Sequence, residues 1–198
     1  MSALDSFALP NRAKIAGRAS VITHAFASGV IPGIMPTDEE VQKALDVLGM
    51  NEGKVVCAYC GDPATEWDHL NAIIKDKKPT GFFTEIHNLV PACGKCNQSK
   101  RNQPWRKWIV SSARLSPKTR GISDIENRIA RLDAYERTFK PRVIDFEAVI
   151  GKNSWEKHWA NCKAIKDLMR ESQELSDEIA KTLQAYAEEE NLKTVFQN

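Results

Sequence analysis

No stretch of this sequence approaches the roughly 18–20 consecutive apolar residues that a membrane-spanning helix needs. The segment from Met1 to Pro10 also lacks the basic start and apolar run of a secretory signal. We therefore expect a cytoplasmic protein with no membrane partner. The hydrophobic share of 42% and the charged share of 27% are ordinary for a globular chain. A length of 198 residues is enough for one domain, or for a small module with helical additions.

Acidic residues are absent from Ile86 to Ser123, although the chain as a whole carries a formal net charge of only +2. A local basic block on an otherwise mildly acidic chain fits a polyanionic partner. A solvated surface would explain the charge equally well, so this pattern does not decide the function by itself. The stretch holds eight basic residues: Lys95, Lys100, Arg101, Arg106, Lys107, Arg114, Lys118 and Arg120.

The cysteines are few but regularly placed. Four of the five form two C-x-x-C pairs, Cys57 with Cys60 and Cys93 with Cys96, and the fifth, Cys162, falls on an apolar helical face. In a reducing compartment such pairs favour metal binding or redox chemistry over disulfides. Two pairs together supply the four thiolates of a closed, tetrahedral zinc site. A redox function explains only one pair at a time and stays the alternative.

The periodicity of apolar residues divides the chain into three regions. Residues 1–50 are predicted to be helical, with a capping box at Thr37 and Glu40. In the middle region, residues 51–113, the helical period disappears between Lys54 and Leu89, where short extended segments are expected. Helices are predicted from Ala92 to about Arg101 and from Trp105 to Ala113. Residues 114–198 are again predicted to be mostly helical, with a second capping box at Ser123 and Glu126. The sequence therefore predicts a small α+β core with helical additions on both sides.

Polar residues that suit catalysis lie between and beside the cysteine pairs. In chain order they are Asp68-His69, Asn88 and Asn97, and Asn97 directly follows the last cysteine of the second pair. The strings "WDHL" and "HNLVPACGKCNQSKRN" resemble the motif of HNH endonucleases, in the version with paired zinc-binding cysteines. The resemblance extends from Cys57 to about Trp108. It implies a core of the ββα-metal type.

The resemblance also implies a role for each matched position. His69 corresponds to the general base that deprotonates the attacking water. Asp68 and Asn97 correspond to the protein ligands of one catalytic divalent ion, Mg²⁺ or a substitute. Asn88 corresponds to the asparagine that ties the loop between the two strands and so orients His69. The implied activity is hydrolysis of phosphodiester bonds in double-stranded DNA, leaving 5′-phosphate and 3′-hydroxyl ends.

Elementary chemistry is consistent with these roles. An imidazole with an ordinary pKa near 6.5 suits proton transfer at neutral pH, and carboxylate and amide oxygens are hard ligands that suit Mg²⁺. One difficulty arises because adjacent residues of a strand point to opposite faces. Asp68 and His69 therefore need either a bend in the strand, or a ligand and a base that act from opposite sides of the phosphate.

Residues beyond the cysteine pairs are expected to contact substrate or to pack the fold. Trp105 and Trp108 could stack on substrate or pack the helix, and core packing is favoured for both. His87 could touch substrate or tune the site, and a structural role is favoured for it. The side chains predicted to contact DNA phosphates are the basic ones that follow Asn97, namely Lys100, Arg101, Arg106 and Lys107.

A chain of this size fits a bacterial or phage restriction-type enzyme, by size and analogy alone. A homodimer is compatible with this function, because one such site cuts one strand. The alternative from another class is a non-catalytic zinc module that binds nucleic acid. A redox protein that uses its C-x-x-C pairs is the third interpretation.

Overall fold

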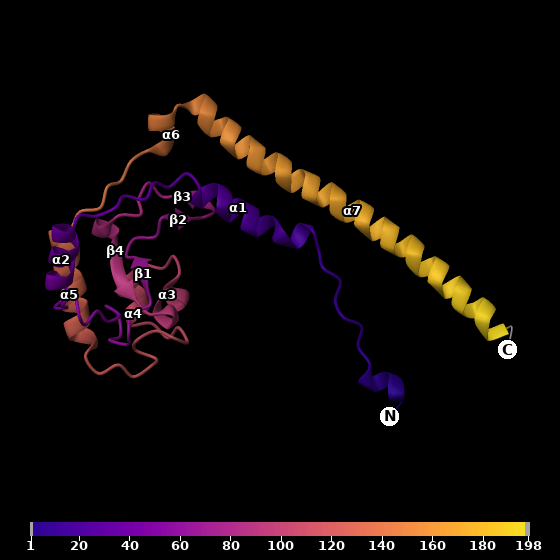
Figure 1. Ribbon diagram of the computed structural model, residues 1–198, viewed down its shortest axis with the longest axis horizontal. Coiled ribbons are helices and arrows are strands. Elements are labelled where there is room, and N and C mark those ends of the chain that lie inside the picture. The colour runs from indigo at the N-terminus through magenta and orange to yellow at the C-terminus, as the bar shows by residue number, and fades with distance from the viewer. Residues whose placement is uncertain (1, 197–198) are drawn as a thin grey trace. The chain divides into compact units, whose positions relative to one another are not determined.

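The structure is a computed structural model that describes residues 2–196, without the side chains of residue 4 and residues 190–196. The chain forms two compact units (Figure 1). One consists of Met1–Phe26 with Lys152–Asn198, and the other of Ala27–Gly151. The boundaries expected at residues 50 and 113 differ from these. The last two residues of the C-terminal region that we predicted to be helical, 197–198, lie outside the described residues.

The central element of the second unit is a two-stranded antiparallel sheet followed by a helix. Strand β1 (Glu66–His69) pairs with β4 (Leu89–Ala92), and Asp68 lies opposite Val90. Helix α3 (Gly94–Lys100) begins directly after β4. This ββα arrangement confirms the α+β class that the sequence predicted.

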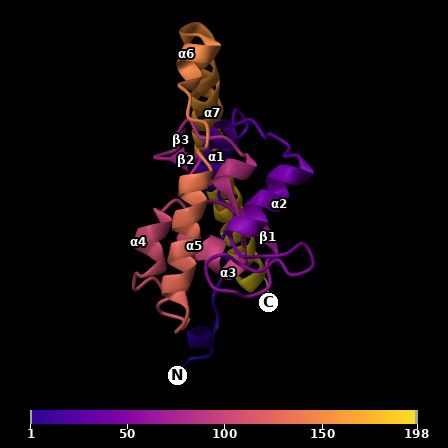
Figure 2. The same ribbon diagram turned by 90° about the vertical axis from the view of Figure 1, so that its left-hand side faces the viewer.

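Two further helices lie side by side against this element, as Figures 1 and 2 show. Helix α2 (Asp38–Val47) begins at the predicted capping box, because Thr37 accepts from the backbone of Glu40 and the Glu40 carboxylate accepts from the backbone of Thr37. Helix α5 (Ile125–Thr138) contributes Tyr135, whose hydroxyl donates to the Leu89 carbonyl at 2.8 Å. Both helices supply buried residues to the core that contains the cysteines, so the unit extends beyond the predicted core.

Short elements complete this unit. They are the hairpin strands β2 (Ile74–Lys75) and β3 (Lys78–Pro79), the 3-10 turn η3 (Ile86–Asn88), and helices α4 (Trp105–Ile109) and α6 (Phe146–Ile150). Trp105 and Trp108 are buried in the core, as predicted. The second capping box is wrong: Asp124 is the N-cap of α5, and its side chain makes no capping hydrogen bond.

The first unit consists of the 3-10 turns η1 (Ala3–Ser6) and η2 (Ala16–Arg18), most of α1 (Ala19–Ser28), and the long helix α7 (Lys152–Phe196). The Nε2 atom of His158 in α7 donates to the backbone carbonyl oxygen of Phe26 at 3.0 Å. Cys162 is buried, as predicted from its apolar helical face. Among the described residues, no helix is long and apolar enough to cross a membrane.

Candidate active site

The four cysteines of the two C-x-x-C pairs converge at one point. Cys57 and Cys60 precede β1, and Cys93 and Cys96 lie at the start of α3. All four are buried, and their sulfur atoms lie within 4.8 Å of one another. The Sγ atoms of Cys60 and Cys93 are 3.6 Å apart, and a tetrahedral zinc ion with bonds of about 2.3 Å would hold its sulfurs about 3.8 Å apart. The cluster therefore fits a structural zinc ion.

Arg120 compensates part of the charge that four thiolates would bring to this cluster. Its Nη1 donates to the Sγ atom of Cys96 at 3.4 Å, and its Nη2 donates to Asp62 at 2.6 Å. Hydrogen bonds with Cys57 and Cys96 lower the pKa of the Cys60 thiol, whereas hydrogen bonds among the cysteines raise the pKa values of Cys57 and Cys96, so the cluster stabilises one thiolate beside protonated thiols. A cluster that stabilises a thiolate is suited to a metal ion, because the thiolate is the form that binds metal.

The carboxylate of Asp68 is buried and is held through one oxygen. Oδ2 accepts from the Tyr59 hydroxyl at 2.6 Å and from the Lys100 ammonium at 2.9 Å. Burial raises the pKa of Tyr59 well above its ordinary value, so the hydroxyl keeps its proton and donates. Within the described part of the chain, Oδ1 accepts no hydrogen bond. Asp68 thus has one oxygen fixed by protein groups and a second one available to an ion.

Lys100 was predicted to contact DNA, and the structure corrects this prediction. Its side chain is fully buried. Besides the ion pair with Asp68, its ammonium donates to the carbonyl oxygen of His69 at 2.7 Å. A buried ammonium needs such partners, because leaving one unpaired costs several kcal/mol. Lys100 therefore ties helix α3 to the end of strand β1 and does not face solvent.

Asp68 has a structural role as the ion-pair partner of Lys100, besides its candidate role as a metal ligand. The structural role can be tested separately through the stability of the fold. Replacing Asp68 by alanine leaves Lys100 buried without its anion, which we expect to lower the free energy of unfolding by about 3–5 kcal/mol. Urea denaturation of the zinc-loaded protein measures this change. Asn97→Ala is the matched control, and we expect it to cost less than about 1 kcal/mol because Asn97 is only half-buried. Equal stability of the two variants would contradict the structural role of the ion pair.

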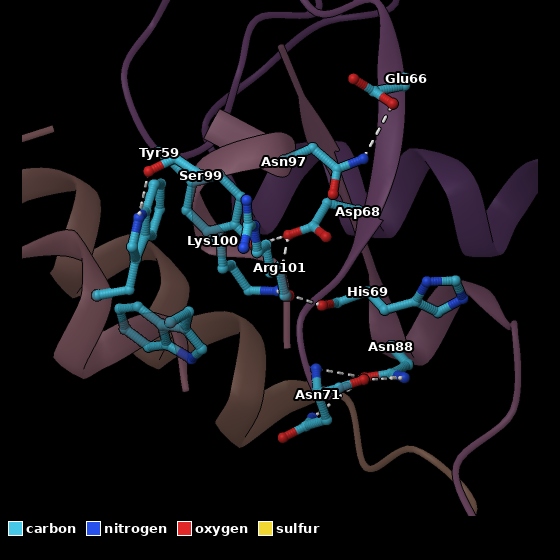
Figure 3. Close-up of polar contacts among 12 residues, drawn as sticks. Tyr59, Glu66, Asp68, His69, Asn71, Asn88, Asn97, Ser99, Lys100 and Arg101 are labelled. Atoms are coloured by element: carbon cyan, nitrogen blue, oxygen red, sulfur yellow. Dashed lines mark hydrogen bonds and ion pairs between the residues drawn. The ribbon is translucent and has the colours of Figure 1, made fainter. Parts of the chain in front are cut away.

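Asn97 is oriented by a residue that the sequence did not indicate. Its Nδ2 donates to the Oε2 atom of Glu66 at 2.9 Å. An ionised carboxylate can only accept, so the amide nitrogen must face Glu66 and the amide oxygen must point the other way. Figure 3 shows this oxygen on the side toward Asp68. The signal in the sequence was the spacing of Glu66 and Asp68, because alternate residues of a strand share a face.

We expect Glu66→Ala to weaken the binding of a divalent ion at Asp68 and Asn97 by about 10–100-fold. Without its acceptor, the Asn97 amide is free to rotate and present nitrogen in place of oxygen. The measurement is titration of the zinc-loaded protein with Mn²⁺, followed by electron paramagnetic resonance of the free ion. Glu52→Ala removes an exposed carboxylate elsewhere and is the control. Identical Mn²⁺ affinities in the two variants would show that Glu66 does not orient Asn97.

His69 points away from Asp68. Figure 3 shows that the two side chains leave β1 in opposite directions, as expected for adjacent strand residues. The Nε2 atom of His69 lies 2.9 Å from the Thr84 hydroxyl oxygen. Burial lowers the pKa of His69 below its ordinary value; the charge of Asp68 raises this pKa and that of Lys100 lowers it. A lowered pKa favours the neutral ring, which is the form that can accept a proton.

Asn88 is fully buried and closes the loop between β1 and β4. Its Oδ1 accepts from the backbone nitrogen of Asn71 at 2.9 Å and from the Asn71 amide at 3.1 Å. Its Nδ2 donates to the carbonyl oxygens of Asn71, at 3.0 Å, and Phe83, at 3.3 Å. The bonds with Asn71, which Figure 3 shows, fix the chain directly after His69.

The other three residues predicted to contact DNA are all exposed, but they differ in whether their charge is paired within the protein. Arg101 and Lys107 are exposed. Arg106 is also exposed, but its guanidinium forms ion pairs with Asp133 and Glu136. These pairs come from α5 and offset most of the charge that Arg106 would offer to a phosphate. Arg106 and Lys107 line a cavity of about 480 Å³ that also includes Asn71, the partner of Asn88.

His87 packs against the protein. Its ring stacks on Phe139, with centroids 5.3 Å apart, and its Nε2 lies 3.7 Å from a carboxylate oxygen of Glu40. These contacts join the η3 turn to α2 and α5. They agree with the structural role that the sequence predicted for His87.

The ββα element thus combines a four-cysteine cluster with a buried Asp68 and a half-buried Asn97 at the end of β1, an arrangement that suits a small metal-binding domain. Residues 57–103 match the family model of the HNH endonucleases, so this segment is an HNH endonuclease domain. The CRISPR-associated endonuclease Cas9 of Corynebacterium diphtheriae is 43% identical over 61 residues, which are 29% of this chain and 5% of that protein. The chain thus matches only a small part of this relative. No solved structure matches the chain significantly.

Proposed function

We propose that this protein is a metal-dependent DNA endonuclease. The observation that carries the proposal is the arrangement of three groups within an HNH-type domain. Asp68 and Asn97 each keep one oxygen that accepts no hydrogen bond from the described residues, on one side of β1. The neutral imidazole of His69 lies on the other side. A phosphodiester positioned at the end of β1 would have ligand oxygens on one side and a base on the other.

Two kinds of metal site suit the residues present. The four cysteines are soft ligands that suit a closed zinc site with a structural role. Asp68 and Asn97 are hard oxygen ligands that suit Mg²⁺ or another divalent ion. When bound there, such an ion would neutralise charge on the phosphate and assist the departing 3′ oxygen.

The chain's own residues would act in the following way. His69 accepts the proton of the attacking water, which is the task of a general base. Tyr59 and Lys100 hold Asp68 in place through its Oδ2 atom, and Glu66 keeps the Asn97 oxygen toward Asp68. Asn88 fixes the loop after His69 and so limits the positions that the base can take.

Hydrolysis of this type leaves 5′-phosphate and 3′-hydroxyl ends on double-stranded DNA. Arg101 and Lys107 are exposed basic residues that follow Asn97 and form no ion pair within the described part of the chain, and they would contact phosphates without reading the base sequence. A restriction-type function and a homodimer stay predictions that rest on chain size and on the one strand cut per site.

The experiment that tests this proposal is incubation with a mixture of plasmid and genomic DNA, followed by sequencing of the fragment ends. We expect fragments that ligate readily, because ligation needs 5′-phosphate and 3′-hydroxyl ends. Discrete end sequences would support a restriction-type enzyme, and scattered ends a non-specific nuclease. Fragments with 3′-phosphate ends would contradict the proposed chemistry.

A further inference from the structure

The hydroxyl of Thr84 is the group in contact with the His69 ring, at 2.9 Å from Nε2. Thr84 lies between β3 and η3, fifteen residues after His69. We propose that Thr84 is a positioning residue for the reaction: it accepts a hydrogen bond from Nε2–H and thereby leaves Nδ1 as the atom that takes the proton from water. This proposal rests on the nuclease function proposed above.

The two nitrogens of a neutral imidazole differ in what they can do. One of them carries a hydrogen and the other carries the lone pair. Thr84 occupies the hydrogen-bonding direction of Nε2, so a water molecule cannot approach that nitrogen. Within the described residues, Nδ1 has no hydrogen-bonding partner. A general base must keep its lone pair on the nitrogen that water can reach, which assigns the hydrogen to Nε2 and the acceptor role to Thr84.

Thr84 is itself fixed by a segment outside the HNH match. Its backbone nitrogen donates to the carbonyl of Pro32 at 3.1 Å, and its carbonyl accepts from Ile34 at 2.9 Å. The two bonds form a parallel bridge between Gly33 and Thr84. Both backbone groups of Thr84 are therefore used, which fixes its backbone at a position from which the hydroxyl reaches His69.

A second segment outside the match fixes the same loop from the C-terminal side. The buried carboxylate of Glu85 accepts from the backbone and the guanidinium of Arg142, at 2.6 Å and 3.2 Å. The backbone of Ile144 donates to Gly81 at 3.1 Å. Gly81 has a φ of +95°, and a Cβ there would lie 2.5 Å from the Ile144 carbonyl oxygen, so only glycine allows this approach.

Two segments outside the motif thus fix the loop that contains Thr84, although both are distant from the motif in the sequence. In the sequence, residues 32–34 precede the matched residues 57–103 and residues 142–144 follow them. In the structure, both segments form backbone hydrogen bonds with residues 81–85. The held loop in turn sets the tautomer and orientation of the base. The HNH segment would therefore need both flanks for a correctly oriented His69, even though it contains every residue of the motif.

The test combines nuclear magnetic resonance with cleavage kinetics on the full chain. Long-range ¹H–¹⁵N spectra report which nitrogen of a neutral histidine carries hydrogen, and comparison with His69→Gln identifies the His69 signals. We expect the Nε2–H tautomer in the wild type and an increased fraction of the Nδ1–H tautomer in Thr84→Val. For cleavage of a labelled duplex, Thr84→Val should lower kcat about 10–100-fold at unchanged KM.

Two further variants separate positioning from folding. Thr84→Ser keeps the hydroxyl and should restore kcat to within about threefold of the wild type. Thr138→Val makes the same change on the exposed face of α5, where the hydroxyl donates to a backbone carbonyl, and should leave kcat and the His69 spectrum unchanged.

The outcomes distinguish failure of the role proposed for Thr84 from failure of the nuclease function itself. An Nδ1–H tautomer in the wild type would overturn the role of Thr84, because the hydroxyl would then donate to Nε2. Wild-type kcat in Thr84→Val would overturn it as well, while leaving the nuclease function intact. If the wild type cleaves no DNA, the proposed function fails and the role of Thr84 in it fails too.

Discussion

Replacing His69 by alanine is expected to lower the rate of DNA cleavage by about 10²–10⁴-fold, the contribution of a general base. The fold should survive, because the His69 side chain has one hydrogen bond, to Thr84, and the backbone carbonyl that accepts from Lys100 remains. DNA binding should stay within about twofold of the wild type, since no basic side chain is removed. Single-turnover cleavage and fluorescence anisotropy on the same duplex measure the two quantities.

A matched control is available in His24→Ala, which removes an exposed histidine on α1. We expect this variant to cleave and bind as the wild type does. If His69→Ala loses binding in parallel with cleavage, His69 supports the structure or the DNA contact and is not the base. If it cleaves at the wild-type rate, another group activates the water.

The second large effect concerns the cysteine cluster. Cys93→Ser should abolish stoichiometric zinc binding and prevent the Ala27–Gly151 unit from folding, because the binding free energy of a structural zinc ion is about 10–16 kcal/mol in small zinc peptides. That amount matches or exceeds the whole stability of a typical domain. Zinc content by mass spectrometry and near-ultraviolet circular dichroism measure the loss.

Cys162→Ser provides the control for this prediction. Cys162 is buried in the other compact unit and is not part of the cluster. We expect the variant to retain one zinc ion per chain and the near-ultraviolet spectrum of the Ala27–Gly151 unit. A Cys93→Ser protein that is folded and free of zinc would show that the cluster has no structural role.

The cluster and the candidate active site are coupled through Tyr59. This residue lies between Cys57 and Cys60, and its hydroxyl donates to Asp68. Loss of zinc would therefore disturb the position of Asp68 even where the surrounding core persists. The same short turn serves both sites, so zinc removal should reduce cleavage together with folding.

The sequence was informative wherever the chemistry depends on residues close together in the chain. The two C-x-x-C pairs predicted one cluster, and their cysteines converge. Thr37 and Glu40, which are three residues apart, predicted the start of a helix, and both hydrogen bonds of the capping box form. Core packing was favoured over stacking on substrate for Trp105 and Trp108, and both side chains are buried.

The sequence was uninformative where a contact joins distant segments. In the sequence, Lys100 resembles a surface cation near the end of a helix. Its burial is explained only by the tertiary structure, in which β1 pairs with β4 and Lys100 of α3 forms an ion pair with Asp68 of β1. The sequence predicts that Arg106 contacts DNA, but in the structure Asp133 and Glu136 of α5 form ion pairs with it. Thr84 has no local feature that distinguishes it from any loop threonine, since its partner His69 is fixed by tertiary structure.

Cleavage of supercoiled plasmid by zinc-loaded protein, with and without added Mg²⁺ or Mn²⁺, tests the central claim most directly. The free divalent ions are first removed with a chelator too weak to extract the structural zinc, and zinc content is verified before the assay. We predict that the protein binds plasmid under both conditions and converts it to nicked or linear forms only when Mg²⁺ or Mn²⁺ is restored. A protein that binds plasmid but leaves it supercoiled with either ion would contradict the nuclease function, and would instead support a non-catalytic zinc module that binds nucleic acid.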